Sequence, residues 1–253
     1  MRYSELDDSD LARLYAYPAD PGGGAQPRTL RANMVMSADG AATLAGASAG
    51  LSSAADRHVF ALNRSLADVI LVGASTARIE RYAPVRIREL WQHLRDGRTP
   101  TPPIAVITSL RDLDPANPLI ADAPAHARTI IITTEQAPPD ARARMAAHAD
   151  VVVAGDSQVD MKAAVGALTD RGHRHILAEG GPGFLAQLVA ANQLDELCLT
   201  IGPLLAGPGA PRILAGAEMP QPLPLSLAHV IEDNGFLLCR YTIGSGGSPE
   251  TTR

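Results

Sequence analysis

The sequence has only two cysteines among its 253 residues, and this scarcity limits the covalent and metal chemistry open to the chain. Cys198 and Cys239 each lie in an apolar, strand-like run, and neither belongs to a CxxC motif or has a histidine close by in sequence. This setting favours two buried free thiols. We therefore expect neither a disulfide nor a zinc or other metal site.

Positive charge and long apolar runs are also scarce. The chain has 22 lysines and arginines against 27 aspartates and glutamates, whereas nucleic-acid-binding domains usually present a basic field. Its apolar runs are shorter than the roughly 20 residues that a membrane helix needs. The acidic start MRYSELDDSD also lacks the pattern of a signal peptide. We expect a cytoplasmic protein with no nucleic-acid or membrane partner.

Strand-like and helix-like segments, by contrast, alternate through most of the chain. Strands are predicted in TLRANMVMS, DVILVG, PIAVITS, RTIIITT, DVVVAG, HRHILAE and ELCLTIGPLL, and helices in SAADRHVFALNRSL, PPDARARMAAH, DMKAAVGALTDRG and PGFLAQLVAANQ. Residues 75–95 are predicted to be helical or irregular. The alternation predicts an α/β fold with a mostly parallel central sheet flanked by helices. SLAHVIED and GFLLCRYTI predict an antiparallel C-terminal hairpin that turns at Asn234-Gly235.

The same patterns divide the chain into three parts. Residues 1–27 form an N-terminal arm with one short helix in SDLARLYAY, followed by a connector rich in glycine and proline. Residues 28–243 form one domain, since no repeat or change in composition marks a second one. Residues 244–253, GSGGSPETTR, are predicted to be disordered.

The turn LAEGGPGF, residues 177–184, joins a predicted strand to a predicted helix. Free backbone N–H groups and the helix dipole could bind a pyrophosphate there. An ordinary glycine turn is the alternative. The turn is not GxGxxG and comes late in the chain, so a Rossmann site at the first strand is not expected. Glu179 precedes the glycines and is expected to face a substrate. The candidate cofactor-binding residues are Gly180, Gly181, Pro182, Gly183 and Phe184.

Other strand ends carry weaker signals at the edge of the sheet where ligands bind in such folds. Gly73 and Thr76 in VGAST could contact phosphate, or could simply form a turn and a helix cap. Thr108 and Ser109, with Arg111 beyond them, suit an adenosine 2′-phosphate but also suit a polar turn. SADG, with Gly40, is explained by a tight Asx turn alone.

SSAADRHVFALNR predicts a helix with chemistry on one face. Ser53 and Asp56 have the spacing of a capping box. Asp56, Phe60 and Arg64 recur every four residues and share a stripe about 12 Å long. Either the stripe faces a substrate, or these residues serve capping and core packing.

Taken together, SADG, SSAADR, VGAST, ITSLRD and AEGGPGF have the order and spacing of a known reductase family. The chain resembles, from about Arg28 to Ile243, the pyrimidine reductase domain of bacterial riboflavin biosynthesis, which shares the dihydrofolate reductase fold. The resemblance implies a homodimer that uses NADPH to reduce C1′ of the ribose in 5-amino-6-(5-phosphoribosylamino)uracil. The HxE and PCxxC motifs of a zinc deaminase half are absent, so we expect a stand-alone reductase.

The resemblance also implies roles for individual residues. Val35, Thr76 and the turn from Gly181 to Gln187 would bind NADPH, with Thr108 or Ser109 at its adenosine end. Ser48, Arg64 and Glu179 would contact the substrate, Arg64 through its phosphate.

Asp56 matches the acid that contacts the pteridine in dihydrofolate reductase and is the candidate proton donor. The chain departs from the family at ARIERYAPVRIR, where DxPxLTxR is usual. Glu80 is expected to replace the cofactor-binding aspartate, and Arg86 or Arg88 the substrate-binding arginine in a shifted register. Gly50 stands at or near the place of the family's tryptophan.

These departures leave three hypotheses. The first is the NADPH-dependent pyrimidine reductase. The second keeps the fold and cofactor but takes dihydrofolate or another pterin, which Asp56 would suit. The third is a nucleotide-binding homologue without catalytic activity.

Overall fold

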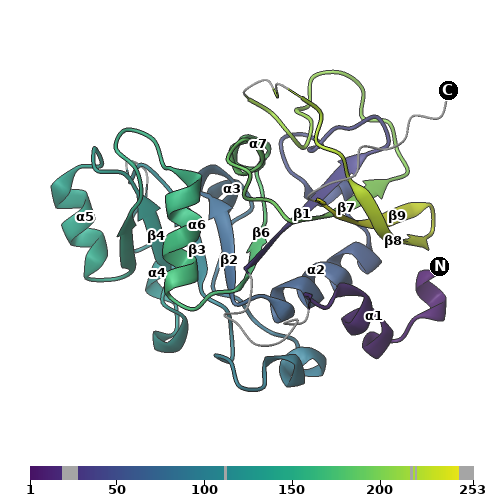
Figure 1. Ribbon diagram of the computed structural model, residues 1–253, viewed down its shortest axis with the longest axis horizontal. Helices are drawn as coiled ribbons and strands as arrows, with labels where there is room; N and C mark the ends of the chain where they lie inside the picture. The colour runs from purple at the N-terminus through teal and green to yellow at the C-terminus, as the bar shows by residue number, and fades with distance from the viewer. Residues whose placement is uncertain (19–27, 111–112, 217–218, 220, 245–253) are drawn as a thin grey trace.

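The computed structural model describes residues 1–18, 28–110, 113–216, 219 and 221–244, which fold around one nine-stranded sheet (Figure 1). The strand order is β5-β4-β3-β2-β6-β1-β7-β9-β8. Neighbours from β5 to β7 pair parallel, and β9 pairs antiparallel with both β7 and β8. The predicted α/β class, with its mostly parallel sheet and antiparallel C-terminal strands, is confirmed.

The elements follow the predicted segments closely. The strands are β1 Thr29–Ser37, β2 Val69–Gly73, β3 Ile104–Ile107, β4 Ile130–Thr133, β5 Asp150–Val153, β6 His175–Ala178, β7 Glu196–Gly202, β8 Ser226–Asp233 and β9 Phe236–Thr242. The α-helices are α1 Asp8–Tyr15, α2 Ala54–Leu66, α3 Ala74–Ile79, α4 Pro118–Ala121, α5 Pro139–Ala146, α6 Met161–Asp170 and α7 Pro182–Ala190. The 3-10 turns are η1 Tyr3–Glu5, η2 Ala49–Leu51, η3 Glu89–Arg95 and η4 Ala125–Ala127.

Two local predictions are confirmed in atomic detail. The β8–β9 hairpin turns at Asn234 and Gly235, whose φ angles of 50° and 83° both lie in the left-handed region that this turn type requires. At the start of α2, the Ser53 hydroxyl accepts the Asp56 backbone N–H at 3.0 Å, as the predicted cap requires. The Asp56 side chain, however, does not complete the capping box, which leaves its carboxylate free for other partners.

Helices cover both faces of the sheet because successive strand residues point to opposite sides. On β2, Leu71 belongs to the apolar cluster that contains Leu188 of α7 and residues of α6. Its neighbour Ile70 belongs to the cluster on the other side, with Met145 of α5. Helices α1 and α2 build a third cluster with β7 and β9. These layers hold the carboxyl ends of the central strands in fixed positions.

The N-terminal segment is fastened to this sheet by two arginines. Arg31 on β1, with none of its surface exposed, donates to the Tyr15 carbonyl and to the Glu196 carboxylate, each at 2.7 Å. Arg240 on β9 donates to the Leu14 carbonyl at 2.7 Å. The predicted short helix is therefore α1, packed on the sheet. The predicted connector at 19–27 and the tail at 245–253 lie outside the described residues.

The two cysteines are free and buried, as predicted. Burial raises the pKa of the Cys198 thiol to about 11. Among the described residues, no helix has the length and apolarity needed to cross a bilayer.

We predict that the protein loses stability in mild acid through His229. This histidine is buried edge-on against the Tyr15 ring, and its Nε2 has no hydrogen-bond partner. Burial, with Arg240 and Arg31 nearby, lowers its pKa to about 4. In the unfolded chain His229 takes up a proton as the pH falls below about 6.5, whereas in the folded chain it does so only near pH 4. The free energy of unfolding therefore falls as the pH drops from about 6.5 toward 4.

Urea unfolding at pH 7 and pH 5 measures this loss. The drop in unfolding free energy between the two pH values should be smaller in His229→Phe than in the wild type by roughly 1 kcal/mol. An equal drop in both proteins would contradict the assignment.

Candidate active site

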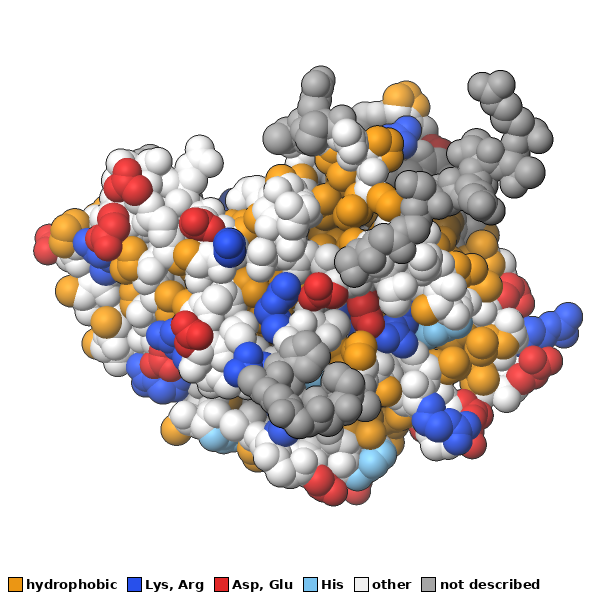
Figure 2. All heavy atoms as spheres, viewed as in Figure 1, with side chains coloured by type: hydrophobic (Ala, Val, Ile, Leu, Met, Phe, Trp, Pro, Cys, Tyr) orange, Lys and Arg blue, Asp and Glu red, His pale blue; other side chains and the backbone are white. Residues whose placement is uncertain are grey.

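A cleft of about 1520 Å³ lies at the carboxyl ends of the central strands. Ligand sites in open α/β sheets form at this edge. Sixteen candidate site residues line it: Val35, Ser48, Asp56, Arg64, Gly73, Thr76, Glu80, Arg86, Thr108, Ser109, Glu179, Gly180, Gly181, Pro182, Gly183 and Phe184. Arg88, the alternative to Arg86, does not line the cleft, and its Nη1 lies 3.1 Å from His58 Nδ1. On the face seen in Figure 2, acidic and basic side chains lie interspersed.

The turn after β6 is built against the turn after β2. Gly73 donates its backbone N–H to the Gly180 carbonyl at 3.2 Å, and Gly180 has a φ of 90°, which only glycine adopts readily. The peptide bond between Gly180 and Gly181 is cis. A Cβ added at Gly181 would lie 2.7 Å from the Thr76 hydroxyl, so a side chain there would require the hydroxyl or the turn to move.

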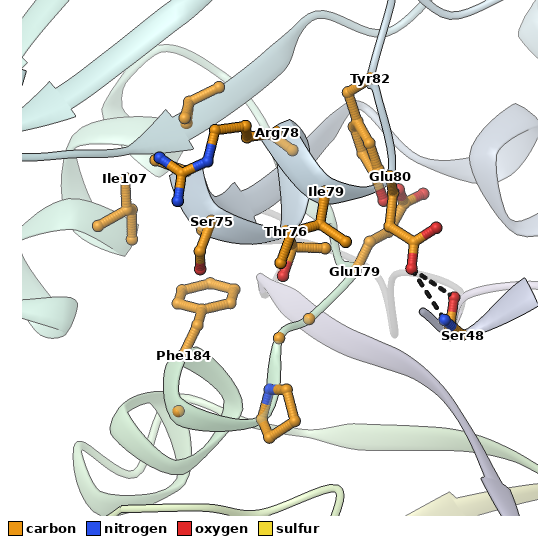
Figure 3. Close-up of a pocket in the computed structure, with 18 of the residues that line it drawn as sticks. Ser48, Ser75, Thr76, Arg78, Ile79, Glu80, Tyr82, Ile107, Glu179 and Phe184 are labelled. Atoms are coloured by element: carbon orange, nitrogen blue, oxygen red, sulfur yellow. Dashed lines mark hydrogen bonds between the residues drawn. The ribbon is translucent and has the colours of Figure 1, made fainter. Parts of the chain in front are cut away.

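Helix α7 begins directly after these glycines. Its N-cap is Gly181, which supplies no side-chain acceptor, and Pro182 follows at the first helical position. The N–H groups of the first turn therefore have no capping side chain and can donate to a ligand. Figure 3 shows the Phe184 ring below Ser75, with Ile107 to one side. The two turns together present backbone donors, the Ser75 and Thr76 hydroxyls and an apolar ring.

Glu179 and Arg64 form a buried ion pair at the centre of the cleft. The Arg64 Nε and Nη2 atoms donate to the two carboxylate oxygens at 2.8 and 2.6 Å, and only 1% of the Glu179 side chain is exposed. Burial opposes the charge on Arg64, but Glu179 offsets this effect and raises the pKa of the guanidinium. The pair unites residues that are 115 positions apart in the sequence.

Asp56 also lies in the cleft and is buried. Its Oδ1 accepts the Thr200 hydroxyl at 2.6 Å and its Oδ2 accepts the Ser52 hydroxyl at 2.5 Å. The predicted stripe on α2 is present, because Phe60 and Arg64 line the same cleft, with the Arg64 guanidinium 4.3 Å from the Phe60 ring centre. The stripe thus places an acid and a cation along one wall.

Ser48 and Glu80, which were predicted as separate substrate and cofactor contacts, are hydrogen-bonded to each other (Figure 3). One Glu80 carboxylate oxygen accepts the Ser48 backbone N–H at 3.0 Å and its hydroxyl at 2.8 Å. This contact joins the loop before η2 to the end of α3. Arg86 is exposed at the cleft and has no hydrogen bond or ion pair among the described residues.

Thr108 and Ser109 lie at the far end of the cleft, beside β3. The Thr108 hydroxyl accepts the Leu110 backbone N–H at 3.0 Å, so this threonine also stabilises its own turn. Arg111 lies outside the described residues. Ser157 and Gln158, after β5, also line the cleft, although no sequence motif predicted them.

Tyr82 was not a sequence candidate, yet it completes the central cluster. Its hydroxyl donates to Glu179 Oε2 at 2.6 Å. It lies in ARIERYAPVR, the segment in which only Glu80 and an arginine were predicted to contact a ligand. Within the part of the chain that the structure describes, no three His, Cys, Asp or Glu side chains are grouped as a metal site.

Comparison with known proteins places this cleft in a family. The model of the RibD C-terminal domain matches residues 28–236. A curated relative from Methanothermobacter thermautotrophicus is 28% identical over 217 residues, which are 83% of this chain and 96% of the relative. It is named 2,5-diamino-6-ribosylamino-4(3H)-pyrimidinone 5′-phosphate reductase. A relative with the same name from Aquifex aeolicus is 31% identical over 61% of this chain and 65% of its own length.

Solved structures agree with this placement. A pyrimidine reductase-like protein from Corynebacterium diphtheriae superposes with a TM-score of 0.79 at 28% identity, over 87% of this chain and 93% of that one. The riboflavin biosynthesis reductase of Saccharomyces cerevisiae shares the fold, with a TM-score of 0.65 at 15% identity over 92% and 97% of the two chains. The family match spans most of the chain, and the chain therefore belongs to the RibD C-terminal domain family.

Proposed function

We propose that this chain is an NADPH-dependent reductase of a ribosylaminopyrimidine 5′-phosphate in riboflavin biosynthesis. The observation that supports the proposal most is one cleft in which a candidate phosphate-binding turn, Gly180 to Phe184, adjoins a buried acid and a half-buried arginine. Curated relatives are named as reductases of such a compound.

The cofactor would lie along the turns after β2, β3 and β6. The N–H groups at the start of α7, with the Thr76 hydroxyl, would donate to its phosphates. The missing side chain at Gly181 is the feature that fits a phosphate approaching the backbone. Val35 would lie at the nicotinamide end, Gly73 and Phe184 near the phosphates, and Thr108 and Ser109 at the adenosine end. Glu80 would contact the cofactor through Oε2, because Oε1 accepts both hydrogen bonds from Ser48.

When bound, the nicotinamide supplies a hydride. The reduction of C1′ also needs a proton on the substrate, which comes from solvent. Asp56 would relay it by taking up a proton from water and passing it on directly, through a water or through the Ser52 hydroxyl. Arg64 and Arg86 are the cations that would bind the substrate's phosphate. The hydrogen bonds between Arg64 and Glu179 hold this wall of the cleft in one geometry before the substrate binds.

Two pyrimidines are candidates for the substrate. The resemblance in the sequence implies 5-amino-6-(5-phosphoribosylamino)uracil, whereas the curated relatives are named for 2,5-diamino-6-ribosylamino-4(3H)-pyrimidinone 5′-phosphate. We propose the diamino compound as the better substrate, because the chain matches those relatives over most of its length. The homodimer implied by the resemblance, with β8 and β9 at its interface, and the cytoplasmic location stay predictions.

Dihydrofolate is the second candidate, and the buried acid Asp56 is the feature that favours it. Purified protein should be given NADPH with each pyrimidine and with dihydrofolate, and the loss of NADPH absorbance followed. Turnover on a pyrimidine and none on dihydrofolate is the expected result. Turnover on dihydrofolate alone would replace the proposed substrate while keeping the cofactor.

Binding of the cofactor can be tested apart from turnover. Saturating NADPH, at about 100 times its Kd, should stabilise the fold by about 2.7 kcal/mol and raise Tm accordingly. An unchanged Tm at that concentration would contradict every cofactor contact above.

A further inference from the structure

We propose that Tyr82 is a positioning residue: its hydroxyl fixes the Glu179 carboxylate, which in turn fixes Arg64, so that Arg64 offers one free edge to an oxyanion of the substrate. Only the substrate part of this inference rests on the proposed function.

Three donors hold the Glu179 carboxylate. Arg64 donates to Oε1 through Nε and to Oε2 through Nη2, and Tyr82 donates to Oε2 as well. The Glu179 side chain is almost wholly buried, so a substrate atom has no exposed carboxylate surface to contact. Glu179 therefore acts through Arg64 instead of contacting the substrate.

Arg64 also packs against two aromatic rings. The guanidinium carbon lies 4.3 Å from the centre of the Phe60 ring and 5.1 Å from the centre of the Tyr82 ring. Such contacts between a guanidinium and aromatic rings are attractive and restrict its rotation. Tyr82 thus contacts the pair twice, through its ring on Arg64 and through its hydroxyl on Glu179.

One edge of Arg64 keeps unused donors. Nη1 has no hydrogen bond among the described residues, and 21% of the side chain is exposed where it lines the cleft. A guanidinium edge of this kind suits a phosphate or carboxylate oxygen, or a polarised carbonyl. A fixed guanidinium loses less freedom on binding than a mobile one, so the cluster strengthens binding without adding a contact.

The hydroxyl of Tyr82 is suited to this task because it stays protonated. Burial and the charge of Glu179 raise its pKa well above the ordinary value of 10, so it donates at all working pH values. Tyr82 also lies in the segment ARIERYAPVR, where this chain departs from the family pattern DxPxLTxR. Tyr82 therefore supports Arg64 from a segment in which this chain differs from the family pattern.

The test compares wild type with Tyr82→Phe, which keeps the ring and removes the hydroxyl. The first readout is hydrogen exchange at the Arg64 Nε–H by NMR, with the signal assigned by its loss in Arg64→Lys. Without the Tyr82 hydrogen bond the Glu179 carboxylate is held less firmly, so its hydrogen bond with Arg64 Nε should open more often and this exchange should speed up about tenfold or more. Tyr3→Phe, outside the cleft, is the matched control and should leave the rate unchanged.

The second readout is steady-state kinetics with the ribosylaminopyrimidine phosphate. KM for this substrate should rise about tenfold, while kcat and the KM for NADPH change less than about twofold, because Arg64 contributes to binding and not to the chemical step. Unchanged exchange at Arg64, or a fall in Tm with KM unchanged, would overturn the proposal. If the wild type turns over no pyrimidine, the proposed function fails, and the exchange measurement alone still decides whether Tyr82 positions Arg64.

Discussion

Replacing Asp56 with asparagine should lower kcat/KM about 100- to 10,000-fold, the range that general acid catalysis typically contributes. The amide can accept the Thr200 or the Ser52 hydroxyl but cannot deliver a proton at neutral pH. NADPH binding should persist, because Asp56 lies on the α2 wall and the turns proposed to bind phosphate lie elsewhere in the cleft. The expected loss is therefore in turnover and not in cofactor affinity.

Controls separate this effect from damage to helix α2. Asp140→Asn removes another acid from the first turn of a helix, α5, which lies outside the cleft, and should leave kcat/KM unchanged. Tm of Asp56→Asn should stay within a few degrees of the wild type, because the Ser53 cap remains. An asparagine variant with full kcat/KM across pH would rule out Asp56 as the source of the proton.

Adding one methyl group at Gly181 should weaken cofactor binding. The Cβ of Gly181→Ala would lie 2.7 Å from the Thr76 hydroxyl oxygen, closer than real Cβ contacts allow. Either the Thr76 hydroxyl or the turn must shift, and either movement would disturb a proposed phosphate contact. We expect Kd for NADPH to rise about tenfold or more, since hydrogen bonds to a charged group contribute about 1.5–3 kcal/mol each.

A double variant distinguishes the clash from general destabilisation. In Gly181→Ala/Thr76→Ala the hydroxyl that clashes is gone, so any fall in Tm caused by the clash should be reversed. NADPH binding should stay weak, because residue 76 no longer has a hydroxyl to donate. Gly166→Ala is the matched control, because a Cβ at this position of α6 meets nothing within 4 Å. Calorimetric titration that finds wild-type affinity in Gly181→Ala would contradict the role given to this turn.

Much of the fold follows from local sequence patterns. The alternation of segments predicted the parallel sheet, Asn234-Gly235 predicted the hairpin, and Ser53 predicted the start of α2. These features depend on backbone angles and on contacts within a few residues, which local sequence determines. The cleft lining was predictable for a related reason, since parallel strands bring their carboxyl ends to one edge.

The pairing inside the cleft was not predictable. Glu179 was expected to meet a substrate, yet its partners are Arg64 and Tyr82, and Ser48 and Glu80 were expected to act apart. Such pairs join residues far apart in sequence, and they depend on side-chain rotamers that packing selects. The attachment of α1 by Arg31 and Arg240 depends in the same way on charges from strands β1 and β9.

The most direct test of the account is NADPH oxidation by the purified wild type with 2,5-diamino-6-ribosylamino-4(3H)-pyrimidinone 5′-phosphate, followed by identification of the product. We predict steady, enzyme-dependent loss of NADPH absorbance matched mole for mole by a product reduced at C1′ of the sugar. No turnover of this compound or of its deaminated counterpart, by a folded protein that binds NADPH, would contradict the proposed function and favour a catalytically silent nucleotide-binding homologue.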